Sequence, residues 1–147
     1  MQKKGKYFIV LILFIGLISG CRNIRPPHGV DPSSLNMVVT GYCSCGKCCE
    51  WGRNWLLRPI YKSGPNKGKV KQVGITSSGK ATRNGTIAAD LSLYPYGTIM
   101  YVPGYGYGVV EDTGKDIKGQ HIDLYFNTHR EALNWGRATS SVKVWKN

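Results

Sequence analysis

Three aspartates lie within or at the end of apolar, strand-like stretches of this 147-residue chain. Asp90 ends "TIAAD", Asp112 lies in "VVEDTG" and Asp123 lies in "HIDLYF". An aspartate on a strand can face solvent without consequence, but a buried carboxylate has a desolvation cost. If the three converge, burial and like-charge repulsion raise at least one pKa and leave a carboxylic acid able to donate a proton near neutral pH. Cleavage of a glycosidic bond requires such an acid.

Four of the five cysteines, Cys43, Cys45, Cys48 and Cys49, fall within seven positions of "GYCSCGKCCEWG". A four-thiolate zinc site normally takes its ligands from two separated segments, and no histidine is close by in the sequence. Disulfides suit an exported protein. The plausible pairs join Cys43 or Cys45 to Cys48 or Cys49, because adjacent cysteines bridge each other poorly. We therefore favour disulfides that hold a loop beside the cleft, with a metal site or free thiols as alternatives.

Short strands must position these residues. Strand-like stretches, punctuated by Gly, Pro and Asn, occur at 36–42, 85–91, 97–104, 107–112, 121–126 and 140–145. Alternation within 121–126 places Ile122, Leu124 and Phe126 on one face, with Asp123 and Tyr125 on the other.

One helix is predicted over residues 129–135. Thr128 and Glu131 form a capping box at its start, and Gly136 stands where a helix ends. His129 is expected on the surface of this helix, and His121, beside Asp123, has no nucleophile in a triad-like context. Many short strands with one late helix predict a mainly β fold in the form of a small closed barrel.

The N-terminus is typical of a lipoprotein signal. Three lysines precede an apolar run of about a dozen residues, which is too short for a confident membrane span of about 20. The run ends in "LISGC", which resembles a lipobox, so residues 1–20 are predicted as the signal peptide and Cys21 as the lipidated residue. Residues 21–35 are predicted as a flexible tether and residues 36–147 as one domain.

The domain has a cysteine-rich, basic and aromatic insertion at 43–72, in which 50–72 is expected to be irregular. Trp51, Trp55 and Tyr61 could stack on sugar rings or bury the insertion against the barrel. The formal charge of +12 falls to +9 without the signal peptide. For an exported protein this favours cell-wall polyanions or anionic lipid headgroups as partners and argues against nucleic acid.

The stretch "GTIAADLSLYPYGTIMYVPGYGYGVVEDTGKDIKGQHIDLYFNTHREALNWG" (85–136) resembles the 3D domain, named for its three aspartates. This domain occurs in membrane-bound lytic transglycosylase A and in stationary-phase survival proteins of Gram-positive bacteria. The matching motifs are "AAD", "P-x-GT", "EDTG-x-x-IKG-x-x-IDLYF" and "EA-x-x-WG", and "TGY" (40–42) resembles the opening strand. The resemblance implies a six-stranded double-psi β-barrel with one short helix near the C-terminus.

The resemblance also implies a lytic transglycosylase, which cleaves the bond between N-acetylmuramic acid and N-acetylglucosamine in peptidoglycan and leaves a 1,6-anhydro ring. It implies Asp123 as the acid and base, with Asp112 and Asp90 tuning its pKa and holding the sugar. Thr113, Gly114 and Lys118 would donate hydrogen bonds to substrate, and Tyr42 would line the cleft.

Such an enzyme needs no cofactor, and we expect a monomer anchored by lipid to the cell membrane or the outer membrane, facing the cell wall. The alternative is a non-catalytic module that binds peptidoglycan glycan strands with the same barrel.

Overall fold

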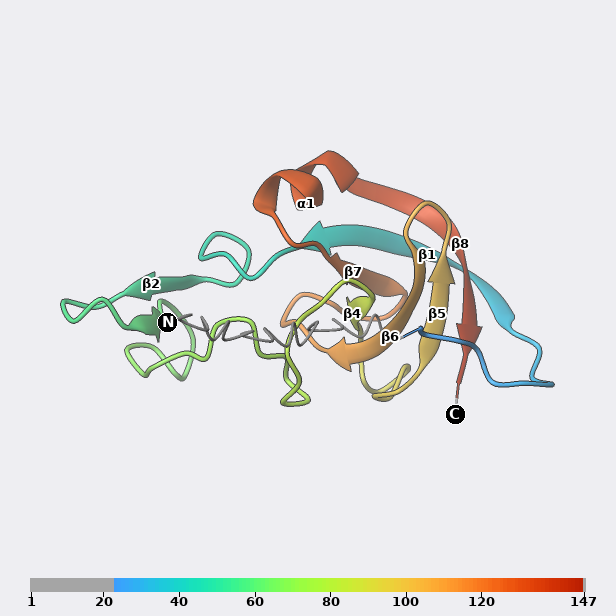
Figure 1. Ribbon diagram of the computed structural model, residues 1–147, viewed down its shortest axis with the longest axis horizontal. Coiled ribbons are helices and arrows are strands. Elements are labelled where there is room, and N and C mark those ends of the chain that lie inside the picture. The colour runs from blue at the N-terminus through green and yellow to red at the C-terminus, as the bar shows by residue number, and fades with distance from the viewer. Residues whose placement is uncertain (1–22, 147) are drawn as a thin grey trace, which may run out of the picture.

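The computed structural model describes residues 23–146, so the predicted signal peptide and Cys21 lie outside the described residues. Six strands form a closed barrel in the order β1-β7-β4-β6-β5-β8, with one short helix packed beside it (Figure 1). These elements are β1 (Ser33–Tyr42), β4 (Thr86–Ala88), β5 (Ile99–Val102), β6 (Gly106–Asp112), β7 (His121–Tyr125), α1 (His129–Trp135) and β8 (Arg137–Trp145). The predicted mainly β, six-stranded barrel with a helix near the C-terminus is confirmed. Within the described range no helix has the length and apolarity needed to span a membrane.

Parallel pairing brings distant parts of the chain together. β1 pairs with β7 and β4 pairs with β6 in parallel, whereas the other barrel pairs are antiparallel. Two parallel pairs within one closed barrel form the double-psi arrangement that the resemblance implied. A parallel pair needs a long crossover. The connection from β1 to β7 contains the insertion and the loop between β6 and β7, and the connection from β4 to β6 contains β5.

The core forms by simple alternation along the strands. Buried side chains occur two residues apart in β1, β7 and β8, where every second residue points into the barrel. The pairs are Met37 and Val39, Ile122 and Leu124, and Val142 and Val144, all 0–2% exposed. Asp123 and Tyr125 face the other way, as the alternation predicted, and Tyr125 packs with Tyr42 and Ala88 in a second, smaller cluster.

Helix α1 begins as its sequence indicates. The Thr128 hydroxyl accepts a hydrogen bond from the Glu131 backbone N–H, and the Glu131 side chain accepts one from the Thr128 backbone N–H. This capping box satisfies donors at the start of the helix. Gly136 follows the last turn with φ of 70°, a conformation that favours glycine.

Two strands are shorter than predicted, β4 at Thr86–Ala88 and β5 at Ile99–Val102, and two others begin earlier than predicted. β1 begins at Ser33 rather than residue 36, and β8 begins at Arg137 rather than residue 140. The two strands pair with each other from Ser33–Val144 to Thr40–Arg137, so backbone pairing extends into polar segments where no apolar alternation marks a strand. Strand β1 therefore begins within the segment predicted as tether. The segment before it also contacts the barrel, since the Trp145 indole N–H donates to the Val30 carbonyl at 2.9 Å.

The insertion contains a small hairpin as well as irregular chain. β2 (Trp51–Arg53) and β3 (Pro59–Tyr61) pair antiparallel and extend from one side of the barrel (Figure 1). Leu57 in the connecting turn has φ of 60°, a conformation that usually favours glycine. Because leucine occupies this position, the sequence does not mark the turn. The prediction that 50–72 is irregular throughout is therefore wrong for β2 and β3, which form this hairpin.

A buried carboxylate that the sequence analysis overlooked lies beside Asp112. Glu111 is 1% exposed, and its Oε1 is 3.0 Å from Lys80 Nζ and 2.9 Å from Arg83 Nη2. The Thr86 hydroxyl donates to Oε2 at 3.3 Å. The register of β4 and β6 shifts here, since Ile87 pairs with Val110 and Ala88 with Asp112, so Glu111 is the extra residue of a β-bulge. Glu111 thus fastens the segment carrying Lys80 and Arg83 to the barrel.

We expect Glu111→Ala to lower the free energy of unfolding by about 3 kcal/mol, because it removes the buried member of a three-charge network and leaves a cavity. Lys80→Ala should cost under about 1 kcal/mol, since the Lys80 side chain is 49% exposed and Arg83 still pairs with the carboxylate. Urea denaturation of both variants measures the two values. Equal costs would show that the burial of Glu111 contributes nothing.

Candidate active site

A cleft of about 560 Å³ lies between the barrel and the insertion. From the barrel it is lined by Tyr42, Ala88, Asp112 and Asp123. From the insertion and the following loop it is lined by residues that include Tyr61, Lys71 and Ser77. The cleft therefore contains two of the three aspartates that the sequence analysis singled out.

Strand register explains why Asp112 and Asp123 meet. Ala88 of β4 pairs with Asp123 of β7 on one side and with Asp112 of β6 on the other. The two aspartates are thus level with each other, one strand apart on either side of β4, with backbones roughly 10 Å apart. The residue between them in the sheet, Ala88, has only a methyl side chain, and Tyr42, which packs with Ala88, reaches Asp112 with its hydroxyl.

Asp123 has the properties of a proton donor. Burial raises its pKa to about 6, the negative charge of Asp112 adds to the rise, and a hydrogen bond from Thr40 opposes it. The Thr40 hydroxyl, opposite Asp123 in the register of β1 and β7, donates to Asp123 Oδ1 at 2.9 Å. With Oδ1 engaged, Oδ2 can carry the proton. Asp123 is therefore protonated in a substantial fraction of molecules at mildly acidic pH.

His121 acts on Asp123 indirectly. Its Nε2 is 3.0 Å from the Thr40 hydroxyl oxygen, the same hydroxyl that donates to Asp123. Burial and the nearby charge of Arg137 lower the pKa of His121, which favours the neutral ring. In the tautomer with its proton on Nε2 the neutral ring donates to the Thr40 hydroxyl, whereas in the other tautomer Nε2 accepts from it. Thr40 was missed in the sequence, because only the register of two strands 80 residues apart identifies it.

Asp112 is held by four hydrogen-bond donors. Its Oδ2 accepts from the Tyr42 hydroxyl at 2.9 Å, and its Oδ1 accepts from Ser77 Oγ and from the backbone N–H groups of Ser77 and Thr113, each at 2.9 Å. Such a set of donors suits a carboxylate that accepts hydrogen bonds without donating one. Burial and the Asp112 charge raise the pKa of Tyr42, which keeps its hydroxyl protonated and donating. Tyr42 lines the cleft, which is where the sequence analysis expected it.

The structure does not bring Asp90 into the cleft. Its Oδ1 accepts from the backbone N–H and hydroxyl of Ser92, and its Oδ2 accepts from the Gly119 backbone N–H at 3.0 Å. The Gly119 bond is the largest cause of a pKa lowered to about 2, and Lys118 also contributes. Asp90 therefore joins the turn after β4 to the loop before β7, and Lys118 lies near Asp90 rather than among the cleft residues.

The loop from 112 to 119 forms one wall of the cleft. Thr113 and Gly114 line it as expected, and Lys115, Asp116 and Ile117 line it as well. A Cβ on Gly114 would come within 2.8 Å of the Ile117 side chain, so only glycine allows the loop to fold this closely. Gly119 ends the loop with φ of +64° and gives its N–H to Asp90.

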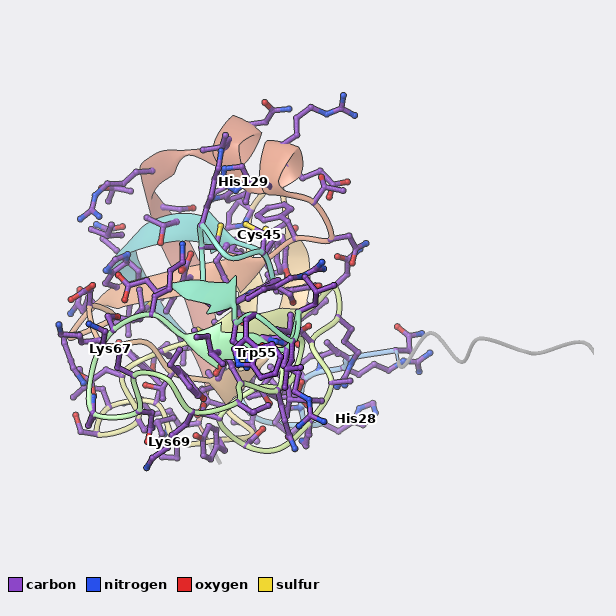
Figure 2. The ribbon with its side chains drawn as sticks, turned by 90° about the vertical axis from the view of Figure 1, so that its left-hand side faces the viewer. His28, Cys45, Trp55, Lys67, Lys69 and His129 are labelled. Atoms are coloured by element: carbon purple, nitrogen blue, oxygen red, sulfur yellow. The ribbon has the colours of Figure 1, made fainter. Side chains whose placement is uncertain are left out.

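The three aromatic residues of the insertion have different surroundings. Tyr61 lines the cleft, with Lys71 Nζ 4.4 Å from its ring centroid. The Trp51 indole N–H donates to the Ser44 carbonyl at 2.9 Å, a structural contact. Trp55 is 87% exposed at the outer end of the insertion and lies outside the cleft (Figure 2). Tyr61 is thus the one of these three placed to stack on a substrate.

Of the four cysteines of 43–49, Cys48 and Cys49 line the cleft, and none of the four is disulfide-bonded in the described chain. Cys43 Sγ and Cys48 Sγ are 3.7 Å apart. His129 is not simply on the helix surface, as the sequence suggested. Its Nδ1 lies 3.6 Å from Cys45 Sγ and 3.3 Å from Cys48 Sγ.

In the comparison with known proteins, a family model described as the 3D domain matches residues 85–146. The cell wall-binding protein YocH of Bacillus subtilis (strain 168) is 41% identical over 75 residues, covering 48% of this chain and 26% of YocH. YabE of the same organism is 37% identical over 75 residues, covering 48% of this chain and 18% of YabE. The chain thus spans about a quarter or less of the length of these relatives.

Among solved structures, E. coli MltA with bound chitohexaose is similar, with 23% identity, coverage of 50% of this chain and 27% of that chain, and a TM-score of 0.42. A structural similarity this low supports no functional conclusion by itself.

Proposed function

We propose that the protein is a peptidoglycan lytic transglycosylase that cleaves the bond between N-acetylmuramic acid and N-acetylglucosamine, a proposal supported by the match of residues 85–146 to the 3D domain model. The observation that carries this proposal is the pairing of Asp123 with Asp112 across Ala88 in one cleft, with the pKa of Asp123 raised to about 6. A carboxylic acid of this pKa can protonate a glycosidic oxygen near neutral pH.

In the proposed reaction the proton of Asp123 passes to the glycosidic oxygen as the bond from that oxygen to muramic C1 breaks. N-acetylglucosamine leaves as the neutral alcohol. The muramic C6 hydroxyl then attacks C1 from within the same sugar and gives its proton to the Asp123 carboxylate, which restores the acid. One group serves first as acid and then as base. No second carboxylate is needed to activate water, because the nucleophile is already part of the substrate.

The neighbours of Asp123 support these two roles. The Thr40 hydroxyl donates to Oδ1, which leaves Oδ2 to carry the proton toward the cleft. Asp112 keeps the proton on Asp123 by its charge, and it can also favour the positive charge that develops on the muramic ring. Thr113 and Gly114 would donate to sugar oxygens, and Tyr61 with Lys71 would contact the glycan along the cleft.

Incubation of the purified protein with peptidoglycan sacculi tests the proposal. We expect soluble muropeptides that end in 1,6-anhydro-N-acetylmuramic acid, identified by mass spectrometry. Products with reducing ends would instead make the protein a hydrolase. Co-sedimentation without soluble product would make it a binding module.

Binding without catalysis is the second candidate, and the cell wall-binding description of YocH favours it. In that case the cleft holds glycan strands and Asp123 accepts or donates hydrogen bonds only. Comparison of Asp123→Asn with the unaltered protein separates the candidates, since a binder would retain most of its affinity for sacculi and neither protein would release products.

The cleft depends on a small residue at position 88. We expect Ala88→Leu to lower kcat/KM on sacculi at least about tenfold, because the larger side chain fills the space between Asp112 and Asp123. Ala88→Gly keeps this space open and should retain most of the activity, and thermal unfolding checks that both variants fold. Full activity in Ala88→Leu would mean that the glycan does not pass between the aspartates.

The proposal includes export and a lipid anchor on Cys21, which would hold the barrel close to a membrane and facing the cell wall. Labelling with a radioactive fatty acid and its loss in Cys21→Ala test this part. Residues 23–29 and the bond from Trp145 to Val30 would leave only a short connection between anchor and barrel. A monomer suffices, because the described chain contains both cleft aspartates.

A further inference from the structure

Three thiols and one imidazole converge where the loop after β1 meets the start of α1. Cys43, Cys45 and Cys48 come from the loop and His129 from the helix, more than 80 residues away in the sequence. Their sulfur atoms and one ring nitrogen all lie within 4.8 Å of one another. Figure 2 shows Cys45 just below His129 on the same side of the molecule. The pairing of β1 and the capping box of α1 form without these four side chains, so they do not explain why the side chains meet.

The spacing of these atoms fits a tetrahedral metal ion. Zinc bonds of about 2.3 Å to sulfur and about 2.0 Å to nitrogen separate two sulfurs by about 3.8 Å, and a sulfur from a nitrogen by about 3.5 Å. The observed separations are 3.7 Å between Cys43 Sγ and Cys48 Sγ, and 3.6 Å and 3.3 Å from His129 Nδ1 to Cys45 Sγ and Cys48 Sγ. Three of the six separations thus match tetrahedral coordination, and the other three are within 4.8 Å.

Local structure holds each of the four groups in place. The Cys48 backbone N–H points at Cys45 Sγ at 3.5 Å, and the Cys49 N–H donates to the Cys45 carbonyl at 3.0 Å, so the loop forms a tight turn around the sulfurs. His129 is the first residue of α1, where the capping box fixes its backbone. Cys49 differs from the other three, since its thiol donates to the Cys43 carbonyl at 3.2 Å and it is not part of the cluster.

We propose that Cys43, Cys45, Cys48 and His129 bind a structural zinc ion. Three thiolates and a neutral imidazole would coordinate it, and the three thiol protons would pass to solvent on binding. Sulfur and imidazole ligands in tetrahedral arrangement are those that zinc prefers. All four positions are filled by protein, which makes the site structural rather than catalytic.

The site would fasten the cleft wall to the barrel. Cys43 directly follows Tyr42, whose hydroxyl donates to Asp112, and the metal would tie this end of β1 to α1. The sequence argument against zinc assumed that all four ligands would come from 43–49. The structure replaces Cys49 with a histidine from a second segment, which is the usual division of ligands in zinc sites.

A disulfide accounts for fewer of these contacts. A bridge between Cys43 and Cys48 would use two sulfurs and leave Cys45 and His129 placed against each other without a role. Zinc would use all four groups.

Metal analysis of the purified full chain, kept reduced and loaded with zinc, tests the proposal. We expect one zinc per chain, and the absorption bands of tetrahedral cobalt–thiolate coordination when cobalt replaces zinc. Cys45→Ser and His129→Ala should each weaken zinc binding more than about 100-fold. Cys49→Ser is the matched control and should keep one zinc. Chelation should lower the unfolding midpoint of the unaltered protein by on the order of 10 °C.

His129→Cys addresses loss of binding through misfolding, since it supplies a fourth thiolate and should retain the metal. Zinc content is measured without substrate, so its outcome is independent of the proposed glycan cleavage. The proposal is overturned if the reduced protein binds no stoichiometric zinc, if Cys49→Ser and Cys45→Ser lose zinc equally, or if a Cys43–Cys48 disulfide persists when zinc and reductant are supplied together.

Discussion

Asp123→Asn should lower the rate of anhydro-muropeptide release from sacculi about 10³-fold, while the protein still folds and binds sacculi. An amide cannot donate a proton to the glycosidic oxygen or accept one from the C6 hydroxyl, and general acid–base catalysis contributes roughly 10²–10⁴-fold. Thr40 can still donate to the amide oxygen, so the local structure has a reason to persist. The measurement is the initial rate of product release, with circular dichroism as the check on folding.

Asp31→Asn is the control for this result, because Asp31 is exposed ahead of β1 and outside the cleft. It removes one negative charge and should leave the rate unchanged. Asp112→Asn should retain some activity, with the alkaline fall of kcat/KM moved below the value near pH 6 expected for the unaltered protein, because the Asp112 charge helps to raise the pKa of Asp123. A fully active Asp123→Asn would remove Asp123 from the chemistry.

Asp123→Asn should also stabilise the protein at neutral pH by up to about 3 kcal/mol relative to its effect at pH 4. The pKa of Asp123 is raised from 3.8 to about 6 in the folded state, chiefly by burial. Between these values the folded chain binds more protons than the unfolded chain, so stability falls as pH rises through this range. Asparagine does not titrate and avoids this loss. Urea denaturation of both proteins at pH 4 and pH 7.5 gives the double difference.

Titration of other groups cancels in this comparison, because both proteins share them. Asp90 has the opposite sign: its lowered pKa contributes stability at neutral pH that is lost only as pH falls from about 4 toward 2. A double difference near zero would mean that Asp123 is well solvated in the folded protein, which would also remove the basis for its role as a proton donor.

Together these results would describe a common trade-off in enzymes. The carboxyl group that makes the cleft reactive is held where its charged form is poorly solvated, and the fold tolerates the cost. Glu111, one residue before Asp112, shows the contrasting case of a buried carboxylate compensated by two cations. The two neighbouring acidic residues differ in their partners: Glu111 pairs with two cations, whereas Asp112 accepts hydrogen bonds from neutral donors that include Tyr42 and Ser77.

Local features were readable from the sequence because they depend on nearby residues. Thr128 and Glu131 fixed the start of α1, and alternation around Asp123 identified which face of β7 is buried. The strands were recognised from apolar runs, although their ends were missed where polar residues of β1 and β8 pair only through the backbone. The barrel as a whole was predicted from motifs that resemble those of the 3D domain.

Only the tertiary structure decided which distant residues meet. The register of β4 with β6 and β7 separates the pair Asp112 and Asp123 from Asp90, although all three end or interrupt similar apolar stretches. The closing of the barrel likewise brings His129 to the cysteines. Alternation tells which way a side chain points, but it carries no information on which strand lies opposite, because that depends on long crossovers whose paths are set by packing of the whole chain.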